Sequence, residues 1–267
     1  MPTPMITLTS AELNTWIAAL LWPLTRILGL IAVAPVFGNT SIPVQIKIGL
    51  GVMLALIVAP TIPALPAIDP MSLPGLLILV QQLIIGLGMG FAMRIIFAAV
   101  EMAGTITGMT MGLSFASFFD PQSRGQSNSI SQFLVLLATL AFLAVNGHLL
   151  LLSALAHSFT TLPISASPLG SQMFKQIADW GAVIFSAGVQ LSLPMVAALL
   201  ITNIALGILT RAAPQLNLFG IGFPITLTVG FVVIGFALPY LATPLERLFQ
   251  QGIEMAGQML AAASGTR

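Results

Sequence analysis

Six long apolar runs constrain the possible folds of this chain more than any other feature. They span about Leu13–Phe37, Val44–Leu65, Leu73–Val100, Ser129–His157, Gly181–Arg211 and Leu218–Thr243, with proline-containing turns between them. A membrane-spanning helix needs about 20 mostly apolar residues, so each run is long enough to form one. The runs therefore predict an all-α, membrane-associated protein. No linker is long enough to divide the chain, so we expect one helical domain over residues 1–267.

The low charge content excludes several classes of function. Only 6% of the residues are charged and 57% are hydrophobic, whereas about 25% of the residues in a soluble domain are charged. Most of the surface must therefore face lipid or other protein. The net charge of +1, without a basic cluster, argues against nucleic-acid binding. The chain has no cysteine and no glycine-rich phosphate loop with a lysine, so we expect no cofactor, no metal and no enzymatic activity.

The stretch Gly104–Pro121, GTITGMTMGLSFASFFDP, has the composition expected of a gate. It begins with Gly104, Gly108 and Gly112, whose four-residue spacing places them on nearly one helix face and permits close backbone approach. It continues with flexible and aromatic apolar side chains, namely Met109, Met111, Leu113, Phe115, Phe118 and Phe119, and it ends at Asp120-Pro121. We interpret it as a close-packing helix that leads into a soft apolar tip.

Glycines, prolines and a few polar residues interrupt the apolar runs. Gly86 and Gly90 form a second site for close helix packing, directly after Gln81-Gln82. Four ionisable residues, Arg26, Arg94, Glu101 and Arg211, lie in or at the ends of apolar runs, where such groups serve pairing or functional roles. Arg94 and Glu101 share a helix face, and we expect an ion pair or carbonyl contact that fixes subunit register; the alternative is that they line the lumen. Arg26 either snorkels or pairs across a subunit boundary, and Arg211 is expected near a helix C-terminus.

The last segment, from Pro244 to about Ala262, has a different pattern. Apolar residues recur at helical spacing opposite a polar face that includes Glu246, Arg247 and Glu254. This pattern predicts an amphipathic C-terminal helix that lies on a membrane surface or against a partner.

Five sequence blocks together resemble the FliR family of flagellar type III export-gate proteins, which has counterparts in virulence injectisomes. In chain order, the blocks are Gly49–Pro60, Gln81–Phe91, Met111–Pro121, Asn146–Leu149 and Arg211–Pro224. They cover nearly the whole chain, and the Met111–Pro121 and Arg211–Pro224 blocks are the specific ones.

The resemblance implies an architecture and a set of partners. Members of the family join FliP and FliQ subunits in a cone of bent helical hairpins, with one copy of the FliR-like chain, in the flagellar basal body at the bacterial inner membrane. Much of the cone stands on the periplasmic side. FlhB wraps the closed cone, FlhA forms a cytoplasmic ring beneath it, and unfolded flagellar proteins pass through the cone. The FliR-like subunit resembles a fusion, which here would place a FliP-like part at about 10–180 and a FliQ-like part at about 181–262.

The resemblance also assigns the plug of the channel to residues 104–121. Its gate residues would be Met109, Met111, Gly112, Leu113, Ser114, Phe115, Phe118 and Phe119. An apolar constriction of this kind blocks ions by dewetting until a substrate passes, and methionine adapts readily to irregular partners. The alternative from the residues alone is ordinary helix packing by the same apolar side chains.

Two other functional classes fit parts of the sequence. Broken helices are typical of secondary transporters, with Glu101 as the candidate coupling carboxylate. Ser114 within Gly112-Leu-Ser-Phe-Ala116, with His148 as a base, is a weak match to an intramembrane serine protease. We expect a non-enzymatic export-gate subunit instead.

Overall fold

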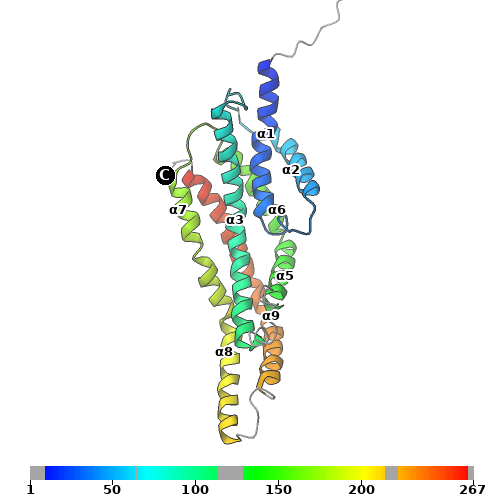
Figure 1. Cartoon of the computed structure of the whole chain (residues 1–267), viewed down its shortest axis with the longest axis vertical. Coiled ribbons are helices and arrows are strands. Elements are labelled where there is room, and N and C mark those ends of the chain that lie inside the picture. Colours follow the sequence, from blue (N-terminus) through cyan, green and yellow to red (C-terminus); the bar gives the residue numbers. More distant parts are fainter. Residues whose placement is uncertain (1–9, 64, 114–128, 214–221, 264–267) are drawn as a thin grey trace, which may run out of the picture. The chain divides into compact units, whose positions relative to one another are not determined.

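The computed structural model of the chain describes residues 10–63, 65–113, 129–213 and 222–263, and the regular secondary structure in these ranges is helical (Figure 1). This confirms the predicted all-α fold. The α-helices are α1 (Ser10–Val33), α2 (Val44–Val58), α3 (Leu73–Thr110), α5 (Ser129–Ala144), α6 (Gly147–Thr161), α7 (Ser171–Trp180), α8 (Val183–Ala212) and α9 (Phe223–Ala263), and a 3₁₀ turn, η1 (Ala59–Thr61), follows α2.

The apolar runs become helices long enough to cross a membrane. Five stretches of the described chain qualify by length and composition, namely Asn14–Val33, Val44–Thr61, Leu73–Thr110, Ser171–Ala212 and Phe223–Ala263. The pair α5 and α6 makes a sixth if the two helices count as one broken span. These stretches agree with the six predicted runs. Helix α3 extends beyond the end of the third apolar run at Val100 and continues through Gly104 and Gly108 to Thr110.

The run Ser129–His157 is broken where a single helix had been expected. Asn146 adopts a left-handed backbone with φ of 56°, and its N–H donates to the carbonyl of Leu143 at 3.1 Å. Asparagine tolerates this conformation better than most residues, and Asn-Gly is a common turn dipeptide. The chain therefore ends α5 at Ala144 and starts α6 at Gly147.

Helix α9 is longer than the sequence predicted because it continues through two prolines. Pro239 and Pro244 lie inside the 41-residue helix, so the sixth apolar run and the predicted amphipathic segment form one element. The amphipathic pattern is confirmed after Pro244, since Leu245, Phe249, Ala256 and Leu260 are buried while Glu246, Arg247, Gln250, Glu254 and Gln258 are exposed. The short helix α7 lies in a region for which the sequence had indicated no separate helix.

The chain divides into two compact units that interleave along the sequence. Unit 1 comprises Met1–Arg94, His148–Asp179 and Gly252–Arg267, and unit 2 comprises Ile95–Gly147 and Trp180–Gln251. Helices α3 and α9 contribute one part to each unit. One unit boundary, at 179–180, falls close to the boundary expected between the FliP-like and FliQ-like parts, but that division itself stays a prediction.

In unit 1, α1 packs closely against α2 and the first part of α3. Gly29 of α1 contacts the main chain of Leu83 and Leu87 so closely that an added Cβ would lie 2.9 Å from the carbonyl oxygen of Leu83. After α1, the chain turns at Val36, which has a φ of 71°, and the N–H of Phe37 donates to the carbonyl of Pro35 at 2.9 Å. A left-handed β-branched residue is strained, so this turn is held by its surroundings.

In unit 2, an aromatic cluster joins α3, α5 and α9. The ring centroids of Phe97 and Phe249 are 5.8 Å apart, and that of Phe142 lies 5.8 Å from Phe97 and 5.2 Å from Phe249. Phe142 meets both other rings edge-on, which suits the charge distribution of aromatic faces and edges. All three rings are buried, so the cluster forms a centre of the unit 2 core.

Candidate gate region at the end of α3

The structure describes the first part of the predicted plug, from Gly104 to Leu113. Helix α3 ends at Thr110, and Gly112 follows in a left-handed conformation with φ of 87°. A glycine with this backbone commonly ends a helix because it has no Cβ to clash. The predicted gate residues Ser114, Phe115, Phe118 and Phe119 lie outside the described residues.

Met111 anchors the end of α3 to the start of α9. Its side chain is fully buried, and its carbonyl oxygen accepts a hydrogen bond from the hydroxyl of Thr226 at 3.1 Å. Its side chain also covers Gly230, where an added Cβ would lie 2.5 Å from the terminal methyl of Met111. Met109, by contrast, is 52% exposed, and Leu113 is half-buried. The gate role of these three residues stays a prediction.

The same part of α3 is held by α5. Gly104 is buried against the main chain of Ser131, which leaves no room for a Cβ. The hydroxyl of Ser131 donates to the carbonyl of Glu101 at 3.0 Å and lies 2.8 Å from the hydroxyl of Thr105. Gly104 therefore packs closely against α5. Gly108 is buried as well.

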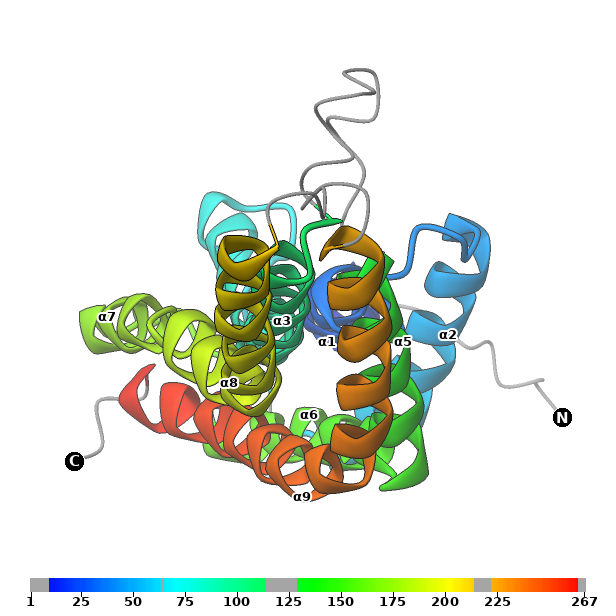
Figure 2. The same cartoon turned by 90° about the horizontal axis from the view of Figure 1, so that it is seen from below.

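Helix α8 holds α3 from a further side, where the two helices run next to one another (Figure 2). An added Cβ at Gly188 would lie 3.0 Å from the side chain of Met102 and 3.1 Å from the carbonyl of Ala99. The buried hydroxyl of Thr107 donates to the carbonyl of Ala103 at 2.8 Å and approaches the sulfur of Met195 at 3.8 Å. We call residues 104–119 the gate segment. Helices α5, α8 and α9 thus hold its base, the part of α3 around Gly104–Met111.

Arg26 forms a buried network in unit 1. Its Nε donates to Oε1 of Gln82 at 2.8 Å, and its Nη2 donates to the carbonyl of Leu162 at 2.9 Å. Its Nη1 donates to the carbonyl and the hydroxyl of Ser158, at 2.8 and 3.0 Å. The guanidinium also lies 4.3 Å from the centroid of the Phe159 ring, a cation–π geometry.

The charge of Arg26 is compensated by the end of a helix. Ser158 lies in the last turn of α6, and Leu162 directly follows the helix. Both carbonyls belong to the negative end of the helix dipole, which favours a cation. The arrangement differs from both alternatives drawn from the sequence, snorkelling and pairing across a subunit boundary. The sequence analysis did not identify Gln82 as the partner of Arg26. The available signal was that each of these polar residues lies inside an apolar run.

The glycines near Gln82 make this network possible. An added Cβ at Gly86 would collide with the carbonyl of Arg26, and one at Gly90 would lie 2.9 Å from the carbonyl of Leu30. Helices α1 and α3 therefore approach at backbone distance, which brings Arg26 within reach of Gln82. The close-packing role predicted for both glycines fits this geometry.

The other ionisable candidates lie on the surface of this chain. Arg94 and Glu101 are exposed on α3, and Arg211 is exposed in the last turn of α8, where it suits the helix dipole. Their contact with neighbouring subunits stays a prediction. His148, considered above as a catalytic base, is half-buried at the start of α6, while its expected partner Ser114 lies outside the described residues.

Comparisons with known proteins match nearly the whole chain. The model of the family described as bacterial export proteins, family 1, matches residues 17–252. The flagellar biosynthetic protein FliR of Pectobacterium carotovorum subsp. carotovorum is 44% identical over 98% of this chain and 100% of its own length. The proteins of the same name from Escherichia coli K12 and Bacillus subtilis 168 are 43% and 33% identical, over 92% and 88% of this chain and 94% and 92% of their own lengths.

Proposed function

Because the chain belongs to family 1 of the bacterial export proteins, together with the FliR proteins, we propose that it forms part of the wall and the plug of a flagellar protein export channel. Its membership and its long apolar helices make it an integral membrane component of the flagellar export apparatus. This family is structural rather than enzymatic. The proposed channel role rests on the geometry at the end of α3.

The observation that carries the proposal is that the gate segment has a firmly held base and an apolar, aromatic sequence beyond it. The base is fixed by hydrogen bonds and close contacts to α5, α8 and α9, and it ends at the left-handed Gly112. The sequence that follows is apolar and aromatic up to Phe119. An apolar segment whose base is held by three helices suits a constriction that dewets and blocks ions. The gate residues are those from Met109 to Phe119 named above.

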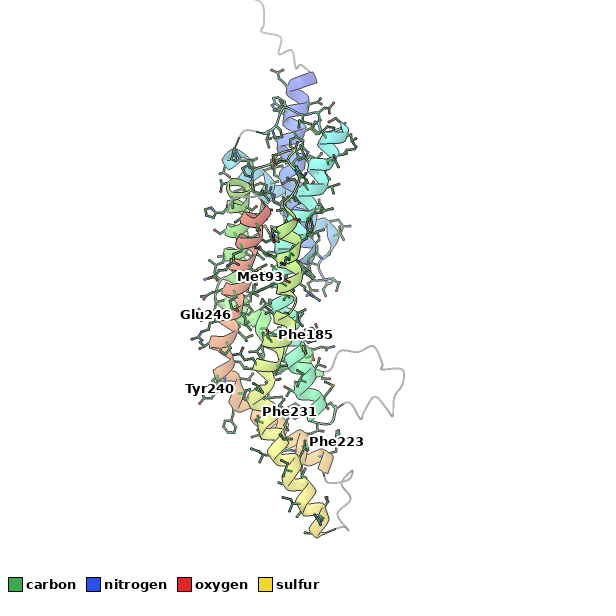
Figure 3. All side chains as sticks on the ribbon, turned by 90° about the vertical axis from the view of Figure 1, so that its left-hand side faces the viewer. Met93, Phe185, Phe223, Phe231, Tyr240 and Glu246 are labelled. Atoms are coloured by element: carbon green, nitrogen blue, oxygen red, sulfur yellow. The ribbon has the colours of Figure 1, made fainter. Side chains whose placement is uncertain are left out.

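The exposed apolar surface supports assembly with other subunits. Phe185 on α8 and Phe231 and Tyr240 on α9 are 64%, 58% and 81% exposed (Figure 3). Two long apolar stretches hold these helices, Ser171–Ala212 and Phe223–Ala263. In each, only 17% of the most apolar 18 consecutive residues are buried. Large contiguous apolar surfaces mark protein or membrane contacts. We assign this surface to FliP and FliQ neighbours and to lipid, with FlhB and FlhA beside the assembly and one copy of this chain in it.

The expected location is the bacterial inner membrane at the flagellar basal body, with much of the assembly on the periplasmic side. Unfolded flagellar proteins would be the exported substrates. In this arrangement, residues 10–180 supply the FliP-like part and 181–262 the FliQ-like part of the wall.

The assembly is tested by native mass spectrometry. The tagged chain is expressed with the FliP and FliQ homologues of its own organism, and the complex is purified in mild detergent. The proposal predicts one large complex of fixed stoichiometry that contains a single copy of this chain. A stable monomer or homodimer of this chain, recovered without FliP and FliQ although both are expressed, would contradict it and would favour the transporter alternative.

A further inference from the structure

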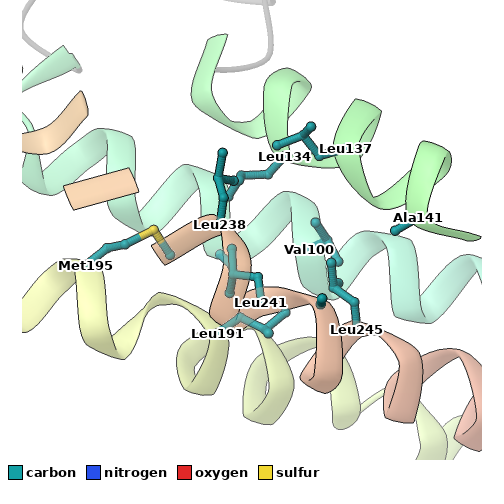
Figure 4. A pocket seen from close by; sticks show the side chains of 11 residues that line it. Val100, Leu134, Leu137, Ala141, Leu191, Met195, Leu238, Leu241 and Leu245 are labelled. Atoms are coloured by element: carbon teal, nitrogen blue, oxygen red, sulfur yellow. The ribbon is translucent and has the colours of Figure 1, made fainter. Parts of the chain in front are cut away.

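Unit 2 contains an apolar cavity of about 190 Å³ between α3, α5, α8 and α9 (Figure 4). The side chains around it include Leu134 and Ala141 of α5, Leu191 of α8, and Leu238 and Leu245 of α9. Every lining side chain is a hydrocarbon, apart from the thioether of Met195. The cavity lies beside the base of the gate segment but contains none of the predicted gate residues.

The chemistry of the lining determines what can occupy the cavity. A buried water needs two to four polar partners, and the lining side chains offer none of them, so water is poorly held there. A cavity of about 150 Å³ lined by Leu, Ile and Phe stays dry and binds benzene or xenon. The larger cavity in unit 2 therefore suits a ligand that is itself a hydrocarbon and makes no hydrogen bond.

Prolines in the lining helices prevent the cavity from closing by straight helix packing. Leu191 and Met195 flank Pro194 of α8, while Leu238 and Leu245 flank Pro239 and Pro244 of α9. Each proline removes a helical hydrogen bond and clashes with the preceding turn, which bends the helix axis. The cavity thus lies next to the prolines of α8 and α9, where these helices cannot be straight.

The neighbours of the lining residues indicate the source of the ligand. Leu136 and Leu140, beside the lining residues of α5, are 57% and 55% exposed, and Tyr240, beside Leu241, is 81% exposed. Helix α9 is also long and apolar enough to span a membrane. Exposed apolar and aromatic side chains therefore lie next to lining residues of α5 and α9 in the sequence, and in a bilayer such side chains meet acyl chains.

We propose that the unit 2 cavity binds the end of a phospholipid acyl chain. This site goes beyond the role in export, because it requires only that the folded chain lies in a membrane. A fully apolar site selects a chain end by shape and makes no demand on the lipid headgroup. The occupant would fill the space that the prolines keep open and would support the helices that mount the gate segment.

The test uses the purified complex in vesicles of phosphatidylethanolamine and phosphatidylglycerol. The vesicles carry a small fraction of phosphatidylcholine with a diazirine at the end of one acyl chain, and illumination labels whatever the chain end touches. Labelled residues are mapped by peptide mass spectrometry. Ala141→Phe fills the cavity, and Ala144→Phe, at an exposed position of the same helix, is the matched control. Leu241→Ala enlarges the cavity.

The proposal predicts labelling of Leu134, Leu238 and Leu241 well above that of an exposed residue such as Ile201. Labelling should fall severalfold in Ala141→Phe, stay unchanged in Ala144→Phe and rise in Leu241→Ala. If Ala141→Phe fails to fold, the rise in Leu241→Ala decides. Equal labelling of lining and exposed residues, insensitive to both cavity variants, would overturn the proposal. Absence of label at the lining in an intact complex would also overturn it.

Discussion

The hydroxyl of Thr226 on α9 donates to the carbonyl oxygen of Met111 at 3.1 Å, across 115 residues of sequence, and shares its hydrogen with the carbonyl of Phe223 in its own helix at 3.0 Å. This bond fixes the last residue before the left-handed Gly112 to the first turns of α9. It joins the end of α3, where the gate segment is held, to helix α9, much of which is exposed. A neighbour that shifts α9 could thereby change the position at which the gate segment begins.

Replacing Thr226 with valine removes this bond and leaves the Met111 carbonyl short of a partner. A buried polar group that loses its hydrogen bond costs about 1–3 kcal/mol. We expect a lower melting temperature of the purified complex and a higher ion leak in cells. Thr228→Val is the control, because the Thr228 hydroxyl is exposed and bonds only within its own helix, to Pro224. Equal effects of the two variants would refute a special role of the Thr226–Met111 bond.

Gly86→Ala should disrupt the packing of α1 on α3. The added Cβ meets the carbonyl of Arg26, and forced overpacking typically costs about 1–3 kcal/mol. The control is Gly49→Ala on α2, where an added Cβ meets nothing within 4 Å. That change should raise stability slightly, since alanine favours helix over glycine by about 1 kcal/mol. Thermal unfolding in detergent measures both, and a stabilising Gly86→Ala would contradict the described contact.

Gln82→Met should destabilise unit 1 because it leaves the Nε–H of buried Arg26 without its acceptor. The expected loss is about 1–3 kcal/mol, whereas Gln81→Met, at the half-buried neighbour, should have little effect. Arg26→Lys should also destabilise, because an ammonium cannot reproduce the fork that reaches Gln82, Ser158 and Leu162. Additive effects of the two changes in the double variant would show that Arg26 and Gln82 do not interact.

Asn146→Val should weaken the break between α5 and α6. Asn146 has a left-handed backbone, which costs most residues about 1–2 kcal/mol and a β-branched residue more. Asn146→Gly should be tolerated, since glycine adopts this conformation freely. The yield and the melting temperature of the complex provide the comparison. A valine variant as stable as the glycine variant would mean that the backbone at 146 is not left-handed.

The sequence predicted the local features of this fold well and the long-range ones poorly. Apolar runs and their proline boundaries locate most helices because span length and turn chemistry are local properties. The glycine spacing at Gly104 likewise predicts the close contact that α5 makes there. For the Arg26 network, a polar residue in each of two apolar runs was the only signal, because its partners are 56, 132 and 136 residues away and no local pattern selects them.

The proline rule failed in α9 and an available signal was overlooked in α5. Pro244 suggested a helix boundary, yet the helix continues through it because a bent helix can keep its other hydrogen bonds. Asn146-Gly147, by contrast, is a turn dipeptide within the fourth apolar run, and it could have located the break. The remainder of the candidate gate, from Ser114 onward, lies outside the described residues and stays a prediction from sequence.

The most direct test of the gate is the ion permeability of cells that carry a complex lacking Gly112–Phe118. Assembly is verified by copurification with FliP and FliQ, and a strain without this chain gives the baseline without a channel. The account predicts that the deletion complex assembles and that the cells leak ions well above this baseline, because the apolar constriction is gone. Normal membrane tightness with a fully assembled deletion complex would contradict it.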